Sequence, residues 1–228
     1  MKKNLNLIDI YNTLYSFYGP QYWWPGDTPF EIAVGAILTQ NTNWGNVEKA
    51  IKNLKDAKAL SAKAMHEMTH NKLASLIRPA GYFNIKAKRL KSFIDFLMDN
   101  YSGSMKRMKK EERGPLRKKL LDVHGIGPET ADSILLYALD KPVFVIDAYT
   151  KRVLSRHKIL DYNASYDEYQ NLFHKEWDED LQLFNEFHAL FVMVGKDYCK
   201  PKPLCEKCPL NVSLQRPAKI GRVKYKSA

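Results

Sequence analysis

The sequence predicts an all-α protein. Apolar residues recur at helical spacing along most of the chain, and glycine, proline and short polar segments separate these stretches. Only the short apolar run from Val143 to Ile146 is compatible with a strand. Of the 228 residues, 45% are hydrophobic and 27% are charged, which suits a soluble protein with a substantial core in one large or two small domains.

The expected helices follow from this spacing and from residues that start or stop helices. Gly19 and Pro20 end the first helix, and Thr28 with Pro29 starts an almost wholly apolar helix suited to the centre of the fold. The segment Ser102–Arg113 is rich in Lys and Arg and is expected to be a solvated connector. The expected helices are Ile8–Tyr18, Phe30–Leu38, Trp44–Leu54, two short helices within Asp56–Ile77 with a break near His70 and Asn71, Tyr82–Asn100, Leu116–Val123, one from Pro128, Ala148–Arg156, Tyr166–Trp177 and Leu181–Lys196.

The charge of the chain favours nucleic acid as the partner. The formal net charge is +11 and the isoelectric point is about 9.4. A general basic bias of the proteome is the alternative explanation, but an excess of this size is typical of proteins that bind a polyanion. Lys2 and Lys3 are followed by Asn and Asp rather than by an apolar core, and no apolar run is long enough for a bilayer. We therefore expect a cytoplasmic protein without a membrane segment.

The segment from Leu121 to Arg156 organises the chain. A helix ends before Gly125-Ile126-Gly127, and Pro128 suits the first position of the next helix. Backbone N–H groups at such a helix start favour an anion such as a DNA phosphate. After that helix comes the apolar run Val143–Ile146, which is followed by one carboxylate, Asp147, directly before another helix. The alternative is a hairpin used only for packing, with Asp147 as a helix N-cap.

This segment resembles the helix-hairpin-helix (HhH-GPD) DNA glycosylases of the endonuclease III superfamily, which carry the "GIG" hairpin and the "VID" aspartate in this order. The resemblance covers almost the whole chain. It implies a monomer with a six-helix barrel at residues 27–141, which contains the hairpin, and a second helical domain made of residues 1–26 and 142–228. It also implies that damaged double-stranded DNA lies in a cleft between the two domains.

Two further segments resemble loops with which this family replaces an extruded nucleotide. In "LTQNT" the residue expected to enter the gap is Gln40, although a polar helix C-terminus is the alternative. "GYFNIKAKRL" resembles the second such loop, with Tyr82 as the wedge where many relatives carry Leu. Lys86, Lys88 and Arg89 follow and could bind phosphates, unless they form a solvated helix face.

The resemblance assigns the chemistry to Asp147. Cleavage of a nucleoside C–N bond builds positive charge on the sugar, which a carboxylate stabilises while it also activates water. Relatives that cut the DNA strand carry a Lys two residues after the hairpin turn, where this chain has Glu129. A carboxylate cannot form the imine that this Lys forms. We therefore expect a glycosylase without lyase activity, with Glu129 either in the base pocket or favoured only by the helix dipole.

The tryptophans resemble those of the 3-methyladenine glycosylase branch, in which a "WWP" segment and an aromatic beyond "TQNT" sandwich the base. The matching pocket residues are Trp23, Trp24, Pro25 and Trp44. Aromatic faces attract a cationic alkylated purine more than a normal base. The alternative is core packing, which applies to at least one ring of the tandem pair.

The three cysteines favour a cytosolic metal site over a disulfide framework. Cys199, Cys205 and Cys208 lie where many relatives hold a [4Fe–4S] cluster, but the fourth ligand position is Leu214. The alternatives are a cluster with a non-cysteine ligand, a [3Fe–4S] form, a zinc ion, or a site without any ligand.

Together these features predict a monofunctional base-excision glycosylase for alkylated purines such as 3-methyladenine. Two alternatives remain: an endonuclease III-like glycosylase and lyase for damaged or mismatched pyrimidines, and a helix-hairpin-helix protein that binds DNA without catalysis.

Overall fold

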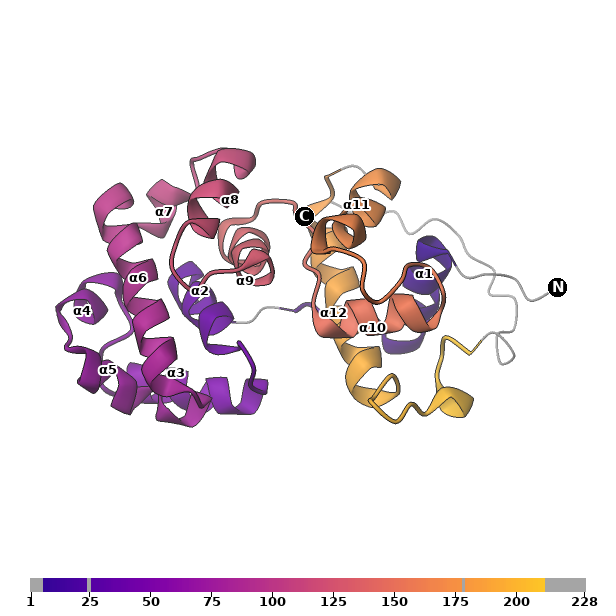
Figure 1. Cartoon of the computed structure of the whole chain (residues 1–228), viewed down its shortest axis with the longest axis horizontal. Coiled ribbons are helices and arrows are strands. Elements are labelled where there is room, and N and C mark those ends of the chain that lie inside the picture. Colours follow the sequence, from indigo (N-terminus) through magenta and orange to yellow (C-terminus); the bar gives the residue numbers. More distant parts are fainter. Residues whose placement is uncertain (1–5, 24–25, 178, 212–228) are drawn as a thin grey trace. The chain divides into compact units, whose positions relative to one another are not determined.

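A computed structural model describes residues 6–23, 26–177 and 179–211 (Figure 1). The described residues form α-helices, short 3₁₀ and π turns and connecting loops, which confirms the predicted all-α fold. The apolar run from Val143 to Ile146 is buried but not a strand. None of the described helices combines the length and the apolar character needed to cross a membrane.

The chain divides into two compact units. The described residues of the first unit are 6–23, 146–177 and 185–211, and those of the second are 26–145 and 179–184. The range 27–141, expected as a barrel, falls within the second unit. Each unit is described separately below.

The second unit is built around α2 (Pro29–Leu38), which packs against α3, α6, α9 and η2. Its core residues Ile32, Ala33, Val34, Ile37 and Leu38 are all buried, as the apolar sequence predicts. The other elements of this unit are α3 (Trp44–Asp56), α4 (Ala62–Glu67), α5 (His70–Leu76), η1 (Arg78–Ala80), α6 (Phe83–Tyr101), α7 (Met105–Met108), α8 (Arg113–Leu121), α9 (Pro128–Ser133) and the π turn η2 (Ile134–Ala138).

Side-chain caps explain where several helices begin. The Thr28 hydroxyl accepts a hydrogen bond from the Glu31 N–H at 3.1 Å, and Pro29 occupies the first turn of α2. Asn43 caps α3 in the same way. Thr69 caps α5, so the break between α4 and α5 lies at residues 68–69, and the prediction of a break near His70 and Asn71 was wrong by two residues.

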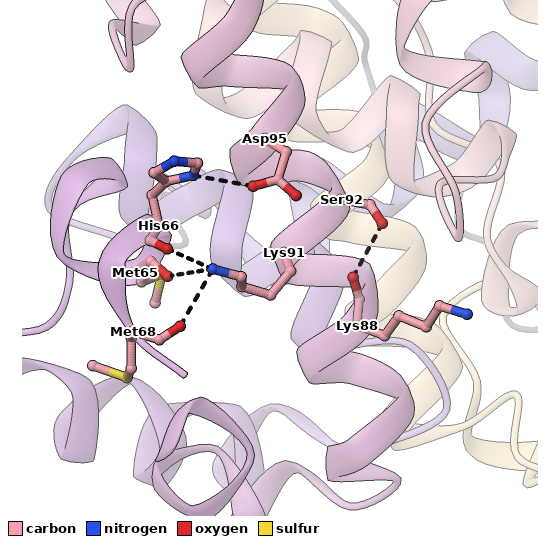
Figure 2. Close-up of polar contacts among 7 residues, drawn as sticks. All are labelled: Met65, His66, Met68, Lys88, Lys91, Ser92 and Asp95. Carbon is pink, nitrogen blue, oxygen red and sulfur yellow. Dashed lines mark hydrogen bonds and ion pairs between the residues drawn. The ribbon is translucent and has the colours of Figure 1, made fainter. Parts of the chain in front are cut away.

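Two side chains of helix α6, Lys91 and Asp95, hold α4 through polar contacts (Figure 2). The Lys91 ammonium donates to the carbonyl oxygens of Met65, His66 and Met68, at 3.2, 2.6 and 3.3 Å, where α4 ends. Nδ1 of His66 lies 3.1 Å from Oδ1 of Asp95. A cation at a helix C-terminus binds carbonyls that have no partner inside the helix, so Lys91 stabilises this end of α4.

The predicted connector at Ser102–Arg113 is partly wrong. It contains α7, in which Met105 and Met108 are buried. Two methionines three residues apart lie on one face of a helical turn and pack into the core, while the lysines and arginines around them stay in solvent.

The first unit consists of α1 (Leu7–Tyr18), α10 (Ala148–Arg156), α11 (Tyr166–Glu176), most of α12 (Leu181–Asp197) and η3 (Cys205–Lys207). Its core contains an aromatic cluster around Phe187 of α12. The Phe187 ring lies 4.6 Å from that of Phe191, 5.5 Å from Phe173 of α11 and 5.2 Å from Tyr11 of α1. These ring contacts hold three helices together.

Candidate functional site

The hairpin between α8 and α9 is anchored by the buried apolar residues Val123 and Ile126. Ile126 is 4% exposed, and its N–H donates to the Val123 carbonyl at 3.0 Å. Gly125 adopts φ +84°, a conformation that favours glycine, and Gly127 is the exposed N-cap residue of α9. No side chain caps α9. The backbone of the turn therefore stays near solvent while Ile126 holds it to the core.

Gln40 lies against this hairpin. Its Nε2 donates to the Gly125 carbonyl at 3.0 Å and to the Thr130 hydroxyl at 2.9 Å. Its Oε1 accepts a hydrogen bond from the Arg89 guanidinium of α6. The side chain is partly buried, so the residue predicted to fill a DNA gap is bound to the protein in this structure.

Tyr82 projects from the protein. It is 68% exposed and precedes α6 in the left-handed conformation, with φ 45°, directly after Gly81 at φ 69°. A left-handed tyrosine is uncommon and strained, and such strain concentrates at functional sites. The structure therefore presents an aromatic ring to solvent at the start of α6.

Lys86 corrects a prediction, because it does not face solvent. It is 1% exposed, and its ammonium donates to the carbonyls of Leu38 at 2.8 Å and Ala80 at 2.7 Å. Burial, reinforced by the charge of Arg89, lowers the pKa of Lys86 to about 8. Lys86 shares the inner face of α6 with Leu90, so it joins the C-terminal ends of α2 and η1 and does not face solvent. Lys88 is exposed and points away from the contacts with α4 (Figure 2).

The predicted pocket residues lie in different parts of the structure. Trp44 and Glu129 belong to the second unit and Trp23 to the first, whereas Trp24 and Pro25 lie outside the described residues. The Trp44 ring is half-buried beside Gly35, where an added Cβ would lie 3.4 Å from it. The Lys196 ammonium lies 5.6 Å from the centre of the Trp23 ring. Glu129 is exposed in the first turn of α9.

Asp147 is both a helix cap and a partly buried carboxylate. Its Oδ1 accepts from the Thr150 N–H at 2.7 Å, and its Oδ2 lies 3.6 Å from Nε2 of His188 on α12. Burial would raise the pKa of Asp147, but the His188 and Thr150 contacts outweigh it and hold the pKa below its usual range. Asp147 is therefore held as an ionised carboxylate, with 12% of its side chain exposed.

Sequence reasoning missed two buried polar residues of α12. His188 and Glu186 are 7% and 8% exposed in a helix that is otherwise largely apolar. The Glu186 carboxylate accepts from the Gln21 N–H at 2.6 Å and so holds the segment that leads to Trp23. Burial raises the pKa of Glu186. Polar residues in an apolar helix were a visible signal, but their partners are too distant in sequence to infer.

The cysteine loop follows α12 and is bound by two arginines of α10. Arg152 donates to the Cys199 carbonyl at 2.5 Å, and Arg156 donates to the Cys199 sulfur at 3.3 Å and to the Lys200 carbonyl at 2.6 Å. These contacts hold the backbone of the loop against α10.

The described part of the loop does not fit a metal centre. Within the described ranges, no three His, Cys, Asp or Glu side chains come close enough together to hold a metal ion. Burial raises the pKa of the Cys208 thiol. Leu214, at the fourth ligand position, lies outside the described residues.

Comparison with known proteins agrees with this combination of helical units, hairpin and carboxylate. Residues 34–179 match the family described as "HhH-GPD superfamily base excision DNA repair protein". A protein of Methanocaldococcus jannaschii, provisionally named a DNA repair glycosylase, is 49% identical over 90% of this chain and 93% of its own. Endonuclease III of Thermotoga maritima is 27% identical over 79% of each chain.

Solved structures show the same fold. The Helicobacter pylori 3-methyladenine DNA glycosylase MagIII, bound to 1,N6-ethenoadenine, is 33% identical with a TM-score of 0.73, over 84% of this chain and 98% of that one. An endonuclease III–DNA covalent intermediate is 22% identical with a TM-score of 0.77, over 90% and 94%.

The fold and the hairpin define a helix-hairpin-helix DNA glycosylase. The chain belongs to the HhH-GPD superfamily of base excision DNA repair proteins.

Proposed function

We propose that the protein is a monofunctional DNA glycosylase that hydrolyses the N-glycosidic bond of alkylated purines such as 3-methyladenine. The observation that carries the proposal is the Asp147 carboxylate, which is nearly buried yet held ionised by Thr150 and His188. The likeness to a 3-methyladenine glycosylase at 33% identity supports the substrate class.

Asp147 would act on the sugar and on water. When the C–N bond breaks, the two electrons of that bond stay on the base. An alkylated purine that was positively charged therefore leaves as a neutral molecule. The sugar becomes positively charged, and the Asp147 carboxylate stabilises that charge. Asp147 then takes a proton from the attacking water, whose oxygen bonds to the sugar carbon. The products are the free base and an intact abasic strand.

The base pocket is proposed to contain Trp23, Trp24, Pro25 and Trp44. Cation–π attraction of about 0.5–2 kcal/mol per ring would favour a cationic base over a neutral one. The partly exposed Trp44 ring and the anchoring of the segment before Trp23 by Glu186 support this role.

DNA binding is proposed to use two groups of residues in the second unit. The backbone of Gly125 and Gly127 binds a phosphate, as expected at an uncapped helix start, and exposed Lys88 adds charge. Tyr82 wedges into the base stack, and Gln40 fills the vacated space. The partner is damaged double-stranded DNA, bound by a monomer in the cytoplasm.

Glu129 supports hydrolysis without strand cleavage, since its carboxylate cannot form an imine with the sugar. The test is borohydride reduction during the reaction with single-lesion duplexes. We expect base release without a trapped protein–DNA complex. Efficient trapping on an oxidised pyrimidine would instead support the endonuclease III-like alternative, which the named relatives at 25–28% identity favour.

The proposed reaction uses no metal. An iron–sulfur cluster or a zinc ion on Cys199, Cys205 and Cys208 stays a prediction. Iron and zinc analysis of anaerobically purified protein tests it, and protein that is folded and active without either metal would contradict a structural role.

A further inference from the structure

Both the nitrogen and the oxygen of the Gln40 carboxamide are hydrogen-bonded within the protein. Both of its N–H donors are used, by the Gly125 carbonyl and the Thr130 hydroxyl, and its oxygen accepts from Arg89. A side chain that fills a gap in DNA has to offer its amide to the exposed base. Gln40 therefore has to leave these partners before it can act on DNA.

Arg89 lies on the turn that is proposed to bind phosphate. A Cβ on Gly125 would lie 2.2 Å from the Arg89 Cγ, so the arginine stem occupies the space that glycine leaves open. The guanidinium is partly buried, and its described partner is a neutral amide. A phosphate would add the attraction between opposite charges, which the neutral Gln40 amide does not supply.

A second cation lies close to Arg89. The charge of Arg89 contributes to the lowered pKa of Lys86, one turn earlier on α6, and the described partners of Lys86 are two neutral carbonyls. Two like charges beside each other, each bound to neutral oxygens, form a local positive field that favours an anion. The proposed function gives this anion as a DNA backbone phosphate bound at the hairpin.

We propose that Arg89 and Gln40 exchange partners when the protein binds DNA: a backbone phosphate takes over the Arg89 guanidinium beside Gly125, and the released Gln40 carboxamide enters the gap. The exchange rests on the proposed function in one respect, which is the binding of phosphate by the hairpin. The exchange couples phosphate binding to gap filling. When the Arg89 guanidinium binds the phosphate it gives up its hydrogen bond to Gln40, and Gln40 is then available to enter the gap.

The first test is the salt dependence of binding to a duplex with a tetrahydrofuran abasic site, measured by fluorescence anisotropy. Arg89→Met keeps the stem on Gly125 but removes the charge, and Arg89→Lys keeps the charge. We expect the slope of log K against log salt concentration to fall by about 0.9 in Arg89→Met and to stay near the wild-type value in Arg89→Lys. Lys91→Met is the matched control, because that ammonium is bound by α4 carbonyls (Figure 2), and its slope should not change.

The second test is a double-mutant cycle with Gln40→Ala on the same duplex. In the wild type, Arg89 loses Gln40 when it gains phosphate, whereas in Gln40→Ala it gains phosphate alone. The affinity lost through Arg89→Met should therefore be roughly two- to tenfold larger in the Gln40→Ala background. An unchanged salt slope in Arg89→Met would exclude the phosphate contact, and equal losses in both backgrounds would exclude the exchange.

Thermal unfolding checks that each variant is folded, and Arg89→Gln replaces the Met variant if that one is not. The tetrahydrofuran duplex has no base to release. A protein that fails to excise 3-methyladenine would therefore refute the proposed substrate and leave these binding tests unaffected.

Discussion

The two oxygens of the Asp147 carboxylate have different partners: Oδ1 accepts from the Thr150 N–H, and Oδ2 faces His188 at 3.6 Å. The distance to His188 is longer than that of an ordinary hydrogen bond. The side chains of Asp147 and His188 are only 12% and 9% exposed. The cap therefore fixes the carboxylate at the start of α10, and His188 helps to keep it ionised.

Asp147→Asn should abolish base release while DNA binding survives. The amide keeps an oxygen for the Thr150 N–H but carries no negative charge and accepts no proton. We expect a loss of roughly 10²–10⁴-fold in the single-turnover rate. Affinity for an abasic-site duplex should stay within about twofold. Full activity in the folded variant would refute the assignment, and absence of activity in the wild type would favour the non-catalytic alternative.

His188→Gln should shift the pH dependence of base release. Burial raises the pKa of Asp147 and His188 opposes this effect, so removing the histidine should raise that pKa. The carboxylate is then protonated at a higher pH, and the acid limb of the pH–rate profile shifts to higher pH. His66→Gln, which breaks the His66–Asp95 pair on α4 and α6, is the matched control and should leave the profile unchanged. An unshifted limb in His188→Gln would contradict the role of the histidine.

Trp44→Ala should weaken excision of a cationic base more than that of a neutral one. Losing one cation–π contact predicts a roughly tenfold lower kcat/KM for 3-methyladenine. Excision of neutral 1,N6-ethenoadenine should fall less, while Trp44→Phe retains a ring and most of the activity. Equal losses for both bases would indicate that Trp44 acts through packing against Gly35 alone.

Tyr82→Gly separates folding from function. Glycine adopts positive φ without strain, so the substitution relieves backbone strain at position 82. The melting temperature should therefore not fall. Loss of the ring should slow base extrusion by roughly ten- to hundredfold. The extrusion rate is measured by 2-aminopurine fluorescence. Tyr162→Gly removes another exposed aromatic, 55% exposed, from the first unit and serves as the control for extrusion. Unchanged extrusion in Tyr82→Gly would rule out the wedge.

Lys86→Met should destabilise the second unit by about 1–3 kcal/mol, because the Leu38 and Ala80 carbonyls lose their donor. The pKa of Lys86 falls from 10.5 to about 8 on folding, so between these pH values the unfolded chain binds more protons. The wild type should therefore gain stability with rising pH across this window, and the variant should not. Urea unfolding at both ends of the window measures this difference. Lys52→Met, which breaks an exposed pair with Asp56, should cost about 0.5 kcal/mol or less.

Local patterns predicted the helices well, because helix caps and buried helix faces are determined by residues that are close in sequence. Thr28 with Pro29 fixed the start of α2, and the helix after Asp147 has the predicted bounds. Lys86 was misjudged because its charge was weighed above its position, four residues before Leu90 on the buried face of α6. The contacts of Gln40 with Arg89 and of Asp147 with His188 join residues 49 and 41 positions apart, so no local pattern reports them.

The central claim is hydrolysis of alkylated purine nucleosides without strand cleavage. The most direct measurement is release of bases from methylated DNA, analysed with and without an alkaline step, beside Asp147→Asn protein. The proposed function predicts free 3-methyladenine from the wild type only, with strand breaks that develop only after alkali. Strand breaks before alkali, or release of oxidised pyrimidines in place of 3-methyladenine, would contradict it.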